Sequence, residues 1–471
     1  MRTFCRACLL LAALRPGFVC AQQAADPALL RVAAAYAAKV TASALFVSGR
    51  TLDSVLDEEL APDRAIEALI RPLLQFDVDA DARTVTCRLG AASATAVATG
   101  DLGCTLVFGA VTADRLRQRT SGGHADAPAD PAAPDWPRGD RAAPPADGID
   151  LAAVERAIDA AFAEPAGKPR IRTRAVVVVH RSELVAARYA AGYTAAMPLP
   201  GWSMSKTLVD ALVGIRVQQG ELDLAAAPDV PEWRLDPDDR RRDIRLEHLL
   251  TMTAGLAWNE DYDDPNSDAL RMLLGSGDHA AEYARQPLVA EPGREYRYAS
   301  GSTNLICRLL RRTFASDTDY WAFPRAALFE PLGMRSALLE TDPSGTFVGS
   351  SYGFATARDW ARFGQLLADD GMVGGRRLLP VGWVARSATP TPASGGRFGW
   401  HLWLNADPDG DGPRQRMWPD LPADLLHLDG HEGQYCVVMP QAQLVIVRLG
   451  CTKSGGFGLH ALLRDVHAAC R

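Results

Sequence analysis

A serine and a lysine three positions apart, Ser203 and Lys206, stand at the start of the most informative stretch of this 471-residue chain. From Leu208 to Val217 only Asp210 and Arg216 are polar, which predicts a helix that is buried nearly all round. Ser203 would lie at the helix start, with Lys206 one turn later on the same face. A helix N-terminus favours a developing oxyanion, and a buried lysine loses proton affinity and can act as a base.

Lysine is scarce in this chain, which makes Lys206 stand out. The four lysines are Lys39, Lys168, Lys206 and Lys453, and the other 46 of the 50 basic residues are arginine. Arginine stays charged and cannot act as a base. The simpler alternative is that Ser203 only caps the helix and Lys206 is solvated, because a bare Ser-x-x-Lys pair is common. The surrounding sequence therefore has to decide between catalysis and capping.

Four further segments follow Ser203–Lys206, at Ile244–Trp258, Glu291–Ile306, Ser351–Gly364 and Gly430–Gln434. Together, and in this order, the five segments resemble the serine β-lactamase and penicillin-binding-protein superfamily. The resemblance covers about residues 170–470 and is greatest to the class C-like branch, in particular to 6-aminohexanoate-dimer hydrolases and related esterases. It implies an α+β fold of the β-lactamase/transpeptidase type, with an antiparallel sheet flanked by helices and a helical subdomain, plus a small N-terminal segment.

The resemblance also assigns a role to Tyr298. Its oxygen would lie near the nucleophile, and proximity to Lys206 would lower the pKa of the phenol, so that tyrosinate takes the serine proton and later protonates the leaving group. The family often ends this triplet with asparagine, whereas this chain has Ser300. Alternatives are the Ser-x-Asn triplet Ser302–Asn304, Tyr296, and a purely structural role for Tyr298 as a core aromatic.

The segment His431–Gly433 stands where β-lactamases usually carry Lys-Thr-Gly. Gly433 would let the substrate backbone approach closely. The resemblance implies that the Gln434 N–H joins the Ser203 N–H as an oxyanion hole, each donor contributing about 3 kcal/mol. Because His431 is mostly neutral at pH 7, it would bind a substrate carboxylate more weakly than lysine does, which lowers the expected turnover of β-lactams.

Three segments match known sequence motifs but lack the neighbouring residues or elements that those motifs require. Ser351, in Gly349–Gly353, fits a nucleophile elbow, but the segment before it contains a proline and two glycines and is a poor strand. Asp407–Gly412 resembles the start of a calcium loop, yet Trp418 occupies the position of the required glutamate. Lys453–Gly455 resembles Lys-Thr-Gly but follows the last expected strand. We therefore expect no metal and no cofactor.

Two sets of residues around the expected cleft remain open. The acidic stretch Glu260–Asp268 is most simply a solvated loop, although it could border the substrate cleft. Four tryptophans could line the same cleft, with core packing as the default for each: Trp202, Trp258, Trp400 and Trp403.

Both ends of residues 149–471 predict strands. Two β-rich pairs separated by short polar stretches read as hairpins, at Ala175–His180 with Leu184–Tyr189 and at Tyr435–Met439 with Leu444–Leu449. Helices are expected at Asp150–Phe162 and at Phe457–Ala469. Strands at both ends with helix-rich sequence between them predict one sheet built from both termini, carrying a helical insertion.

We expect four segments: a signal peptide at 1–21, a small accessory region at 22–117, a linker rich in proline, alanine and aspartate at 118–148, and the hydrolase domain at 149–471. Residues 1–21 combine a positive start, a short apolar core at Ala7–Leu14 and a small-x-small site at Val19–Ala21. Lipidation of Cys20 is a weaker alternative because Val19 is bulky. No later segment approaches 18 consecutive apolar residues, so we expect no stable membrane insertion.

Composition narrows the function class. Apolar residues make up 48% and charged residues 23%, as in globular proteins. The formal net charge of −7 is too acidic overall for a nucleic-acid partner. Six cysteines remain after the predicted cleavage, an even number that permits disulfides in an oxidising compartment. We expect Cys87 and Cys104 to pair, with buried free thiols as the alternative.

These observations predict an exported serine hydrolase, in the periplasm or secreted, that cleaves small esters or amides. The acyl-enzyme would form on Ser203, with Lys206 and Tyr298 as general base and acid. One alternative is a β-lactamase or D-Ala-D-Ala carboxypeptidase-type cell-wall enzyme. The other is a non-catalytic penicillin-recognising sensor on the same fold, against which the intact Ser203, Lys206 and Tyr298 argue.

Overall fold

The structure, a computed structural model, describes residues 26–122, 136–137, 148–166, 170–407, 416–453 and 456–471. The predicted signal peptide at 1–21, and with it Cys20, lies outside the described residues. So does most of the predicted linker at 118–148.

Residues 26–122, called here the N-terminal region, wrap a four-stranded sheet around one long helix. The antiparallel strands run in the order β1 (Gln75–Asp79), β2 (Thr84–Leu89), β3 (Ala92–Ala98) and β4 (Cys104–Leu106). Helix α2 (Pro27–Phe46) packs on β2 and β3 through a row of buried alanines, whose small side chains permit a close approach. The shorter helices are α3 (Leu52–Asp57), α4 (Ala65–Ile70) and α5 (Ala113–Arg117).

Helix α2 also passes a test for membrane spans. Within the described part of the chain it is the one helix long and apolar enough to cross a bilayer by length and composition, and half of that span is buried inside the protein. Core helices of folded regions pass the same test. Its contacts with β2 and β3 assign α2 to the core of the N-terminal region.

The predicted disulfide between Cys87 and Cys104 is wrong. Both thiols are free and buried, on strands β2 and β4 that flank β3 on opposite sides. Cys87 pairs with Ala94 and Cys104 with Ala98, four residues further along β3. That offset alone separates them by about 13 Å, whereas a disulfide needs Cα atoms within about 7 Å. Strand register therefore excludes the bond, and the alternative of buried free thiols is confirmed.

The main sheet joins the two ends of residues 149–471, as predicted. Its six antiparallel strands lie in the order β12 (Trp403–Leu404), β13 (Leu426–Gly430), β14 (Gln434–Met439), β15 (Leu444–Gly450), β5 (Thr173–His180) and β6 (Glu183–Tyr189). Both predicted hairpins form, as β5–β6 and β14–β15. The C-terminal strand β15 pairs with β5 from Leu444 opposite His180 to Gly450 opposite Thr173.

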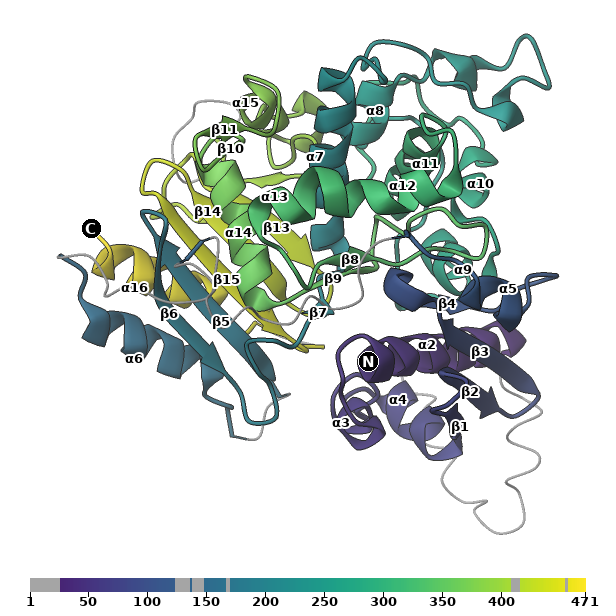
Figure 1. Cartoon of the computed structure of the whole chain (residues 1–471), viewed down its shortest axis with the longest axis horizontal. Coiled ribbons are helices and arrows are strands. Elements are labelled where there is room, and N and C mark those ends of the chain that lie inside the picture. Colours follow the sequence, from purple (N-terminus) through teal and green to yellow (C-terminus); the bar gives the residue numbers. More distant parts are fainter. Residues whose placement is uncertain (1–25, 123–135, 138–147, 167–169, 408–415, 454–455) are drawn as a thin grey trace, which may run out of the picture.

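Helices cover both faces of this sheet (Figure 1). On one face α6 (Leu151–Phe162) and α16 (Leu459–Ala469) share a core with Val176 and Val178. On the other face α14 (Ala357–Ala368) lies so close that a Cβ on Gly364 would come within 2.6 Å of Val445. Burial of both faces agrees with the burial of every residue of β5 and β15 and with the mostly apolar composition of these two strands.

The helical insertion lies between β6 and α14 and surrounds α7 (Ser205–Gln218). Its other helices are α8 (Leu246–Leu250), α9 (Asp268–Gly275), α10 (His279–Ala284), α11 (Ser300–Arg311), α12 (Asp317–Pro324) and α13 (Glu330–Leu332). Short strands β7 (Leu199–Pro200), β9 (Gly353–Ala355) and β8 (Leu338–Leu339) form a small sheet beside it. Hairpin β10 (Met372–Val373)–β11 (Arg376–Arg377) and helix α15 (Trp383–Ser387) follow α14. The predicted α+β fold is confirmed.

The N-terminal region lies beside the small sheet (Figure 1). Buried charged side chains connect it there to the rest of the molecule. Lys39 of α2 forms a fully buried ion pair with Glu340, whose carboxylate also accepts from Ser43 Oγ at 2.9 Å and from the Cys104 N–H at 2.7 Å. Lys453 likewise donates to the carbonyl of Ala61 at 2.9 Å. These contacts connect the N-terminal region to residues 149–471 through buried polar groups.

Candidate functional site

Ser203 lies in a short 3₁₀ turn, Trp202–Met204, that leads directly into α7. Every residue of α7 from Ser205 to Ile215 is buried, as the apolar pattern predicted. Two features fix the turn. A Cβ on Gly201 would lie 2.2 Å from Trp360, so only glycine fits there, and Ser205 Oγ accepts from the Gly353 N–H at 2.9 Å while donating to the Trp202 carbonyl at 2.6 Å.

Lys206 is only 2% exposed, and its Nζ lies among three oxygens. The distances are 2.9 Å to Ser203 Oγ, 3.1 Å to Ser300 Oγ and 2.8 Å to the Ser350 carbonyl. Burial lowers the pKa of the Lys206 ammonium to about 8, against a smaller raising effect of Glu260. The catalytic pair predicted from sequence is therefore in hydrogen-bond contact, and about a tenth of the amine is uncharged at pH 7.

Tyr298 meets the same serine. Its phenol has a hydrogen bond with the Ser203 side chain, its ring lies 4.9 Å from Lys206 Nζ, and Trp403 stacks on it at 5.7 Å. Burial, followed by the charge of Glu260, raises the pKa of the phenol well above its usual value, although the bond from Ser203 acts to lower it. The expectation of a lowered Tyr298 pKa is therefore wrong, because this environment penalises a buried tyrosinate.

Glu260 is the residue that the sequence analysis missed. It lies in the loop between α8 and α9, and its carboxylate accepts from the Ser300 N–H at 2.9 Å and from the Ser300 hydroxyl. Ser300 begins α11, is fully buried and also contacts Lys206. The sequence leaves open whether the acidic stretch is a solvated loop or borders the cleft, because no local pattern distinguishes Glu260 from the exposed Asp261 and Asp263 beside it.

The turn between β13 and β14 brings the third predicted motif beside Ser203. A Cβ on Gly430 would lie 2.2 Å from the Gly201 carbonyl, so this turn packs on the segment that leads to the nucleophile. Gly433 has a φ of +82°, which favours glycine. The Gln434 side chain bridges to the neighbouring strand, donating to the Gly450 carbonyl at 2.7 Å and accepting from the Gly450 N–H at 2.9 Å.

His431 projects from this turn into an aromatic setting. Its side chain is 34% exposed, with its ring centroid 5.6 Å from that of Trp202 and 5.1 Å from that of Tyr262. Three of the four tryptophans considered from sequence contact the site: Trp202 touches His431, Trp258 bonds to Glu260, and Trp403 stacks on Tyr298. Trp400 instead packs on Trp383 in the core, at 5.5 Å.

The alternatives to Tyr298 are Tyr296, Ser302 and Asn304, and the contacts of the three differ. The hydroxyl of Tyr296 is buried with no hydrogen-bond partner among the described residues. Ser302 donates to the Leu249 carbonyl at 2.9 Å. The Asn304 side chain accepts a hydrogen bond from the Ser350 N–H at 3.2 Å. It thereby helps to position Ser350, whose carbonyl accepts from Lys206. Of the three, Asn304 is connected to Lys206, through Ser350.

The other motif matches are also placed. Ser351 is buried and bonds to the Ser350 hydroxyl at 2.9 Å, with no regular strand before it. Lys453 joins the N-terminal region through Glu67 at 3.2 Å. Most of the calcium-like segment Asp407–Gly412, and residues 454–455, lie outside the described residues. Among the described residues no cluster of three or more His, Cys, Asp or Glu could hold a metal ion.

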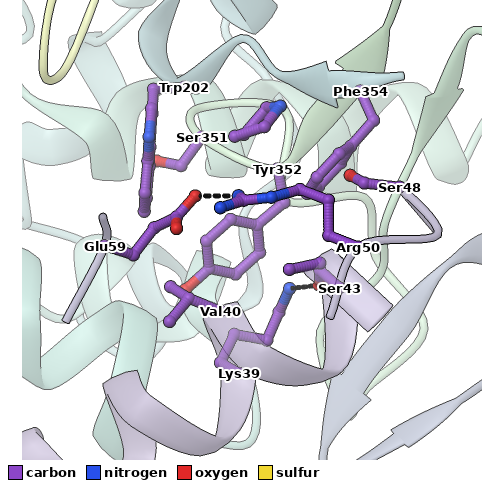
Figure 2. A pocket seen from close by; sticks show the side chains of 12 residues that line it. Lys39, Val40, Ser43, Ser48, Arg50, Glu59, Trp202, Ser351, Tyr352 and Phe354 are labelled. Atoms are coloured by element: carbon purple, nitrogen blue, oxygen red, sulfur yellow. Dashed lines mark hydrogen bonds and ion pairs between the residues drawn. The ribbon is translucent and has the colours of Figure 1, made fainter. Parts of the chain in front are cut away.

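A small cavity of about 30 Å³ lies behind Trp202, between the N-terminal region and the small sheet (Figure 2). Its lining includes Lys39, Arg50 and Glu59 from the N-terminal region, together with Trp202 and Tyr352. Trp202 touches Tyr352 at 6.3 Å between ring centroids as well as His431. The N-terminal region therefore packs against the residue that precedes the nucleophile.

The arrangement of Ser203, Lys206 and Tyr298 can now be set beside known proteins. The Beta-lactamase family matches residues 158–466, well over half of the chain. The chain belongs to the beta-lactamase family. The predicted resemblance is confirmed, and with it the prediction of an enzyme of the serine-hydrolase type.

Relatives of this beta-lactamase-family enzyme include a 6-aminohexanoate-dimer hydrolase from Paenarthrobacter ureafaciens, 27% identical over 296 residues that cover 59% of this chain and 72% of that protein. A solved family VIII carboxylesterase has the same fold, at 16% identity and a TM-score of 0.52, with 68% of this chain and 97% of that chain covered. A penicillin-binding protein homologue from Caulobacter crescentus has the same identity, TM-score and coverage. The N-terminal region lies outside the stretch matched by the family.

Proposed function

We propose that this beta-lactamase-family protein is a serine hydrolase that cleaves small esters or amides through an acyl-enzyme on Ser203. The contact of 2.9 Å between Ser203 Oγ and the buried Lys206 Nζ carries the proposal. A serine needs an adjacent base to become a nucleophile, and a lysine can be that base once its pKa lies near the working pH.

In the first half of the reaction, neutral Lys206 accepts the Ser203 proton while Oγ bonds to the substrate carbonyl carbon. The N–H groups of Ser203 and Gln434 would stabilise the resulting oxyanion, each by about 3 kcal/mol. The C–O or C–N bond of the substrate then breaks. The leaving group takes a proton from the neutral Tyr298 phenol, which regains one from the Lys206 ammonium.

Deacylation repeats these proton transfers with water as the nucleophile. Water gives a proton to Lys206, its oxygen bonds to the acyl carbon, and Ser203 leaves with the returned proton. Because Tyr298 has a raised pKa, it acts throughout as a neutral donor and not as a base. This assignment replaces the tyrosinate expected from sequence.

The side chains around Ser203 favour a small ester or amide substrate with apolar parts. Trp202, Tyr262 and Trp403 present aromatic surface, and the cation expected at the Lys-Thr-Gly position is replaced by His431. The relative from Paenarthrobacter ureafaciens is named for an amide dimer. These features support linear esters or amides as substrates ahead of β-lactams.

A fluorophosphonate probe with intact-mass and peptide mapping tests the nucleophile. We expect a single adduct on Ser203 that is absent from Ser203→Ala and present in Ser351→Ala. An adduct on Ser351, or none, would overturn the assignment. The substrate class is tested by comparing kcat/KM for a nitrophenyl ester and for a chromogenic cephalosporin, where much faster cephalosporin cleavage would refute the ester and amide preference.

We also propose export to the periplasm or the medium, on the strength of residues 1–21 alone. Fractionation with N-terminal sequencing of the mature protein tests this, with Gln22 expected as the first residue. An intact N-terminus in the cytoplasmic fraction would refute export.

A further inference from the structure

Four hydrogen-bond donors converge on the two oxygens of Glu260. Oε2 accepts from the Ser300 N–H at 2.9 Å and from Trp258 Nε1–H. Oε1 accepts from the Ser300 hydroxyl and from the Tyr262 hydroxyl, the latter at 2.9 Å. Two of these donors, a peptide N–H and an indole N–H, have no acceptor capacity. The site is therefore built for a carboxylate in this position.

This arrangement fixes the direction of the hydrogen bond between Ser300 and Lys206. A hydroxyl has a single proton, and Ser300 commits its proton to Glu260. Ser300 Oγ can therefore only accept from Lys206 Nζ, at 3.1 Å. The Ser350 carbonyl, at 2.8 Å, can also only accept. Both neighbours thus require N–H groups from the lysine.

A neutral amine has two N–H groups and one lone pair. If Ser300 and Ser350 take the two N–H groups, the lone pair of Lys206 is left for the third neighbour, Ser203 Oγ, at 2.9 Å. Ser300 and Lys206 are 0% and 2% exposed, so bulk water has little access to exchange these partners. The neutral lysine is then oriented as a base toward the nucleophile before substrate arrives.

We propose that Glu260 is a positioning residue that, through the Ser300 hydroxyl, directs the lone pair of neutral Lys206 toward Ser203. The inference rests on the proposed function, since it concerns the base of that reaction. The role proposed for Glu260 also explains why Ser300 suffices at a position where the family often has asparagine. An amide carries a fixed acceptor, whereas a hydroxyl can rotate and needs Glu260 to hold its proton.

Glu260→Gln tests the proposal because it keeps the shape and reverses one hydrogen bond. The single glutamine oxygen must face the Ser300 N–H and Trp258, which can only donate. Its NH₂ group then faces the Ser300 hydroxyl and donates to it, so the Ser300 proton turns toward Lys206 and competes for the lone pair. We expect kcat/KM for a nitrophenyl ester to fall about 100-fold, the scale of a disabled general base.

The pH profile separates this role from a purely structural one. The titratable groups that face Lys206 are Glu260, Tyr298 and His401, and Glu260 raises the pKa of Lys206. In Glu260→Gln, kcat/KM should therefore begin to fall at a lower pH than in the parent protein. The maximum of kcat/KM at high pH should also be lower than in the parent. A lower maximum without this shift in pH, or an unchanged rate, would overturn the proposal.

Two further variants sharpen the test. Asp261→Asn makes the same acid-to-amide change one residue away on an exposed side chain, and we expect it to stay within about twofold of the parent. Ser300→Ala removes the hydroxyl that connects Glu260 to Lys206, so adding Glu260→Gln to it should lower kcat/KM little further. If the losses of the two single variants add fully in the double variant, the proposed action of Glu260 through Ser300 is refuted. Unfolding temperatures check that each variant is folded.

Failure of the proposed function looks different from failure of this inference. If the parent protein neither hydrolyses esters nor labels at Ser203, the proposed function fails whatever Glu260 does. If the parent is active and labelled while Glu260→Gln matches it in rate and pH profile, only the role of Glu260 is refuted.

Discussion

Removing the carboxylate of Glu340 should loosen the N-terminal region. The substitution Glu340→Gln leaves the Lys39 ammonium 3% exposed and without its charged partner. Breaking a buried ion pair by removing one member costs about 3–5 kcal/mol. Lys39 keeps Ser43 Oγ at 2.9 Å and the ring of Tyr352 at 4.1 Å, which favours the lower end, about 3 kcal/mol.

Hydrogen exchange of peptides from α2 measures this cost locally. A loss of about 3 kcal/mol corresponds to an exchange rate about 160-fold faster in α2, if opening of the region limits exchange. The matched control is Arg88→Gln, which breaks an exposed pair with Asp77 in the same region and should cost less than about 1 kcal/mol.

The double variant Lys39→Met with Glu340→Gln completes the test. Because it removes both charges, it should restore part of the protection lost in Glu340→Gln. Equal exchange of α2 in Glu340→Gln and in the parent protein would show that the buried pair does not hold the region in place, and would refute the reasoning.

Three other predictions concern the site and the thiols. The ester kcat/KM should rise with pH through about 8 and fall about tenfold per unit below it, because protonated Lys206 cannot accept a proton; a flat profile from pH 6 to 9 would exclude lysine as the base. His431→Lys should lower KM for carboxylate-bearing substrates relative to neutral esters, and an equal change for both would contradict its proposed place at the site. Mass mapping without reductant should find Cys87 and Cys104 free, and a linked peptide would contradict the strand register.

Local patterns predicted the scaffold of the site well. The uninterrupted apolar run after Lys206 predicted the buried helix α7, and the paired β-rich runs at both ends predicted the hairpins of one sheet. Ser203 and Lys206 could be found because they lie one helical turn apart, a distance that local geometry sets by itself. Tyr298 could be found only through resemblance, because the fold brings it to Ser203 from the irregular segment that precedes α11.

Two errors have one physical origin. The predicted disulfide between Cys87 and Cys104 is wrong because the distance between them depends on the register of β2 and β4 against β3. The backbone pairing of these strands sets that register, and spacing in the sequence does not. The lowered pKa of Tyr298 failed because burial and Glu260 outweigh the nearby lysine. Both depend on neighbours contributed by distant segments.

The sequence by itself predicted the two hairpins, the buried helix α7, and a serine and a lysine one helical turn apart, and five of its segments resembled the family. Periodicity and short-range spacing suffice for the hairpins, the helix and the serine–lysine pair, since each depends on residues close together along the chain. Only the tertiary structure decided that Glu260, in a loop, reaches Ser300 at the start of α11, and that Ser300 reaches Lys206 in α7. The direction of these buried hydrogen bonds depends on three segments that are far apart in the sequence: the α8–α9 loop, the start of α11, and α7. Only the packing of the whole chain brings the three together.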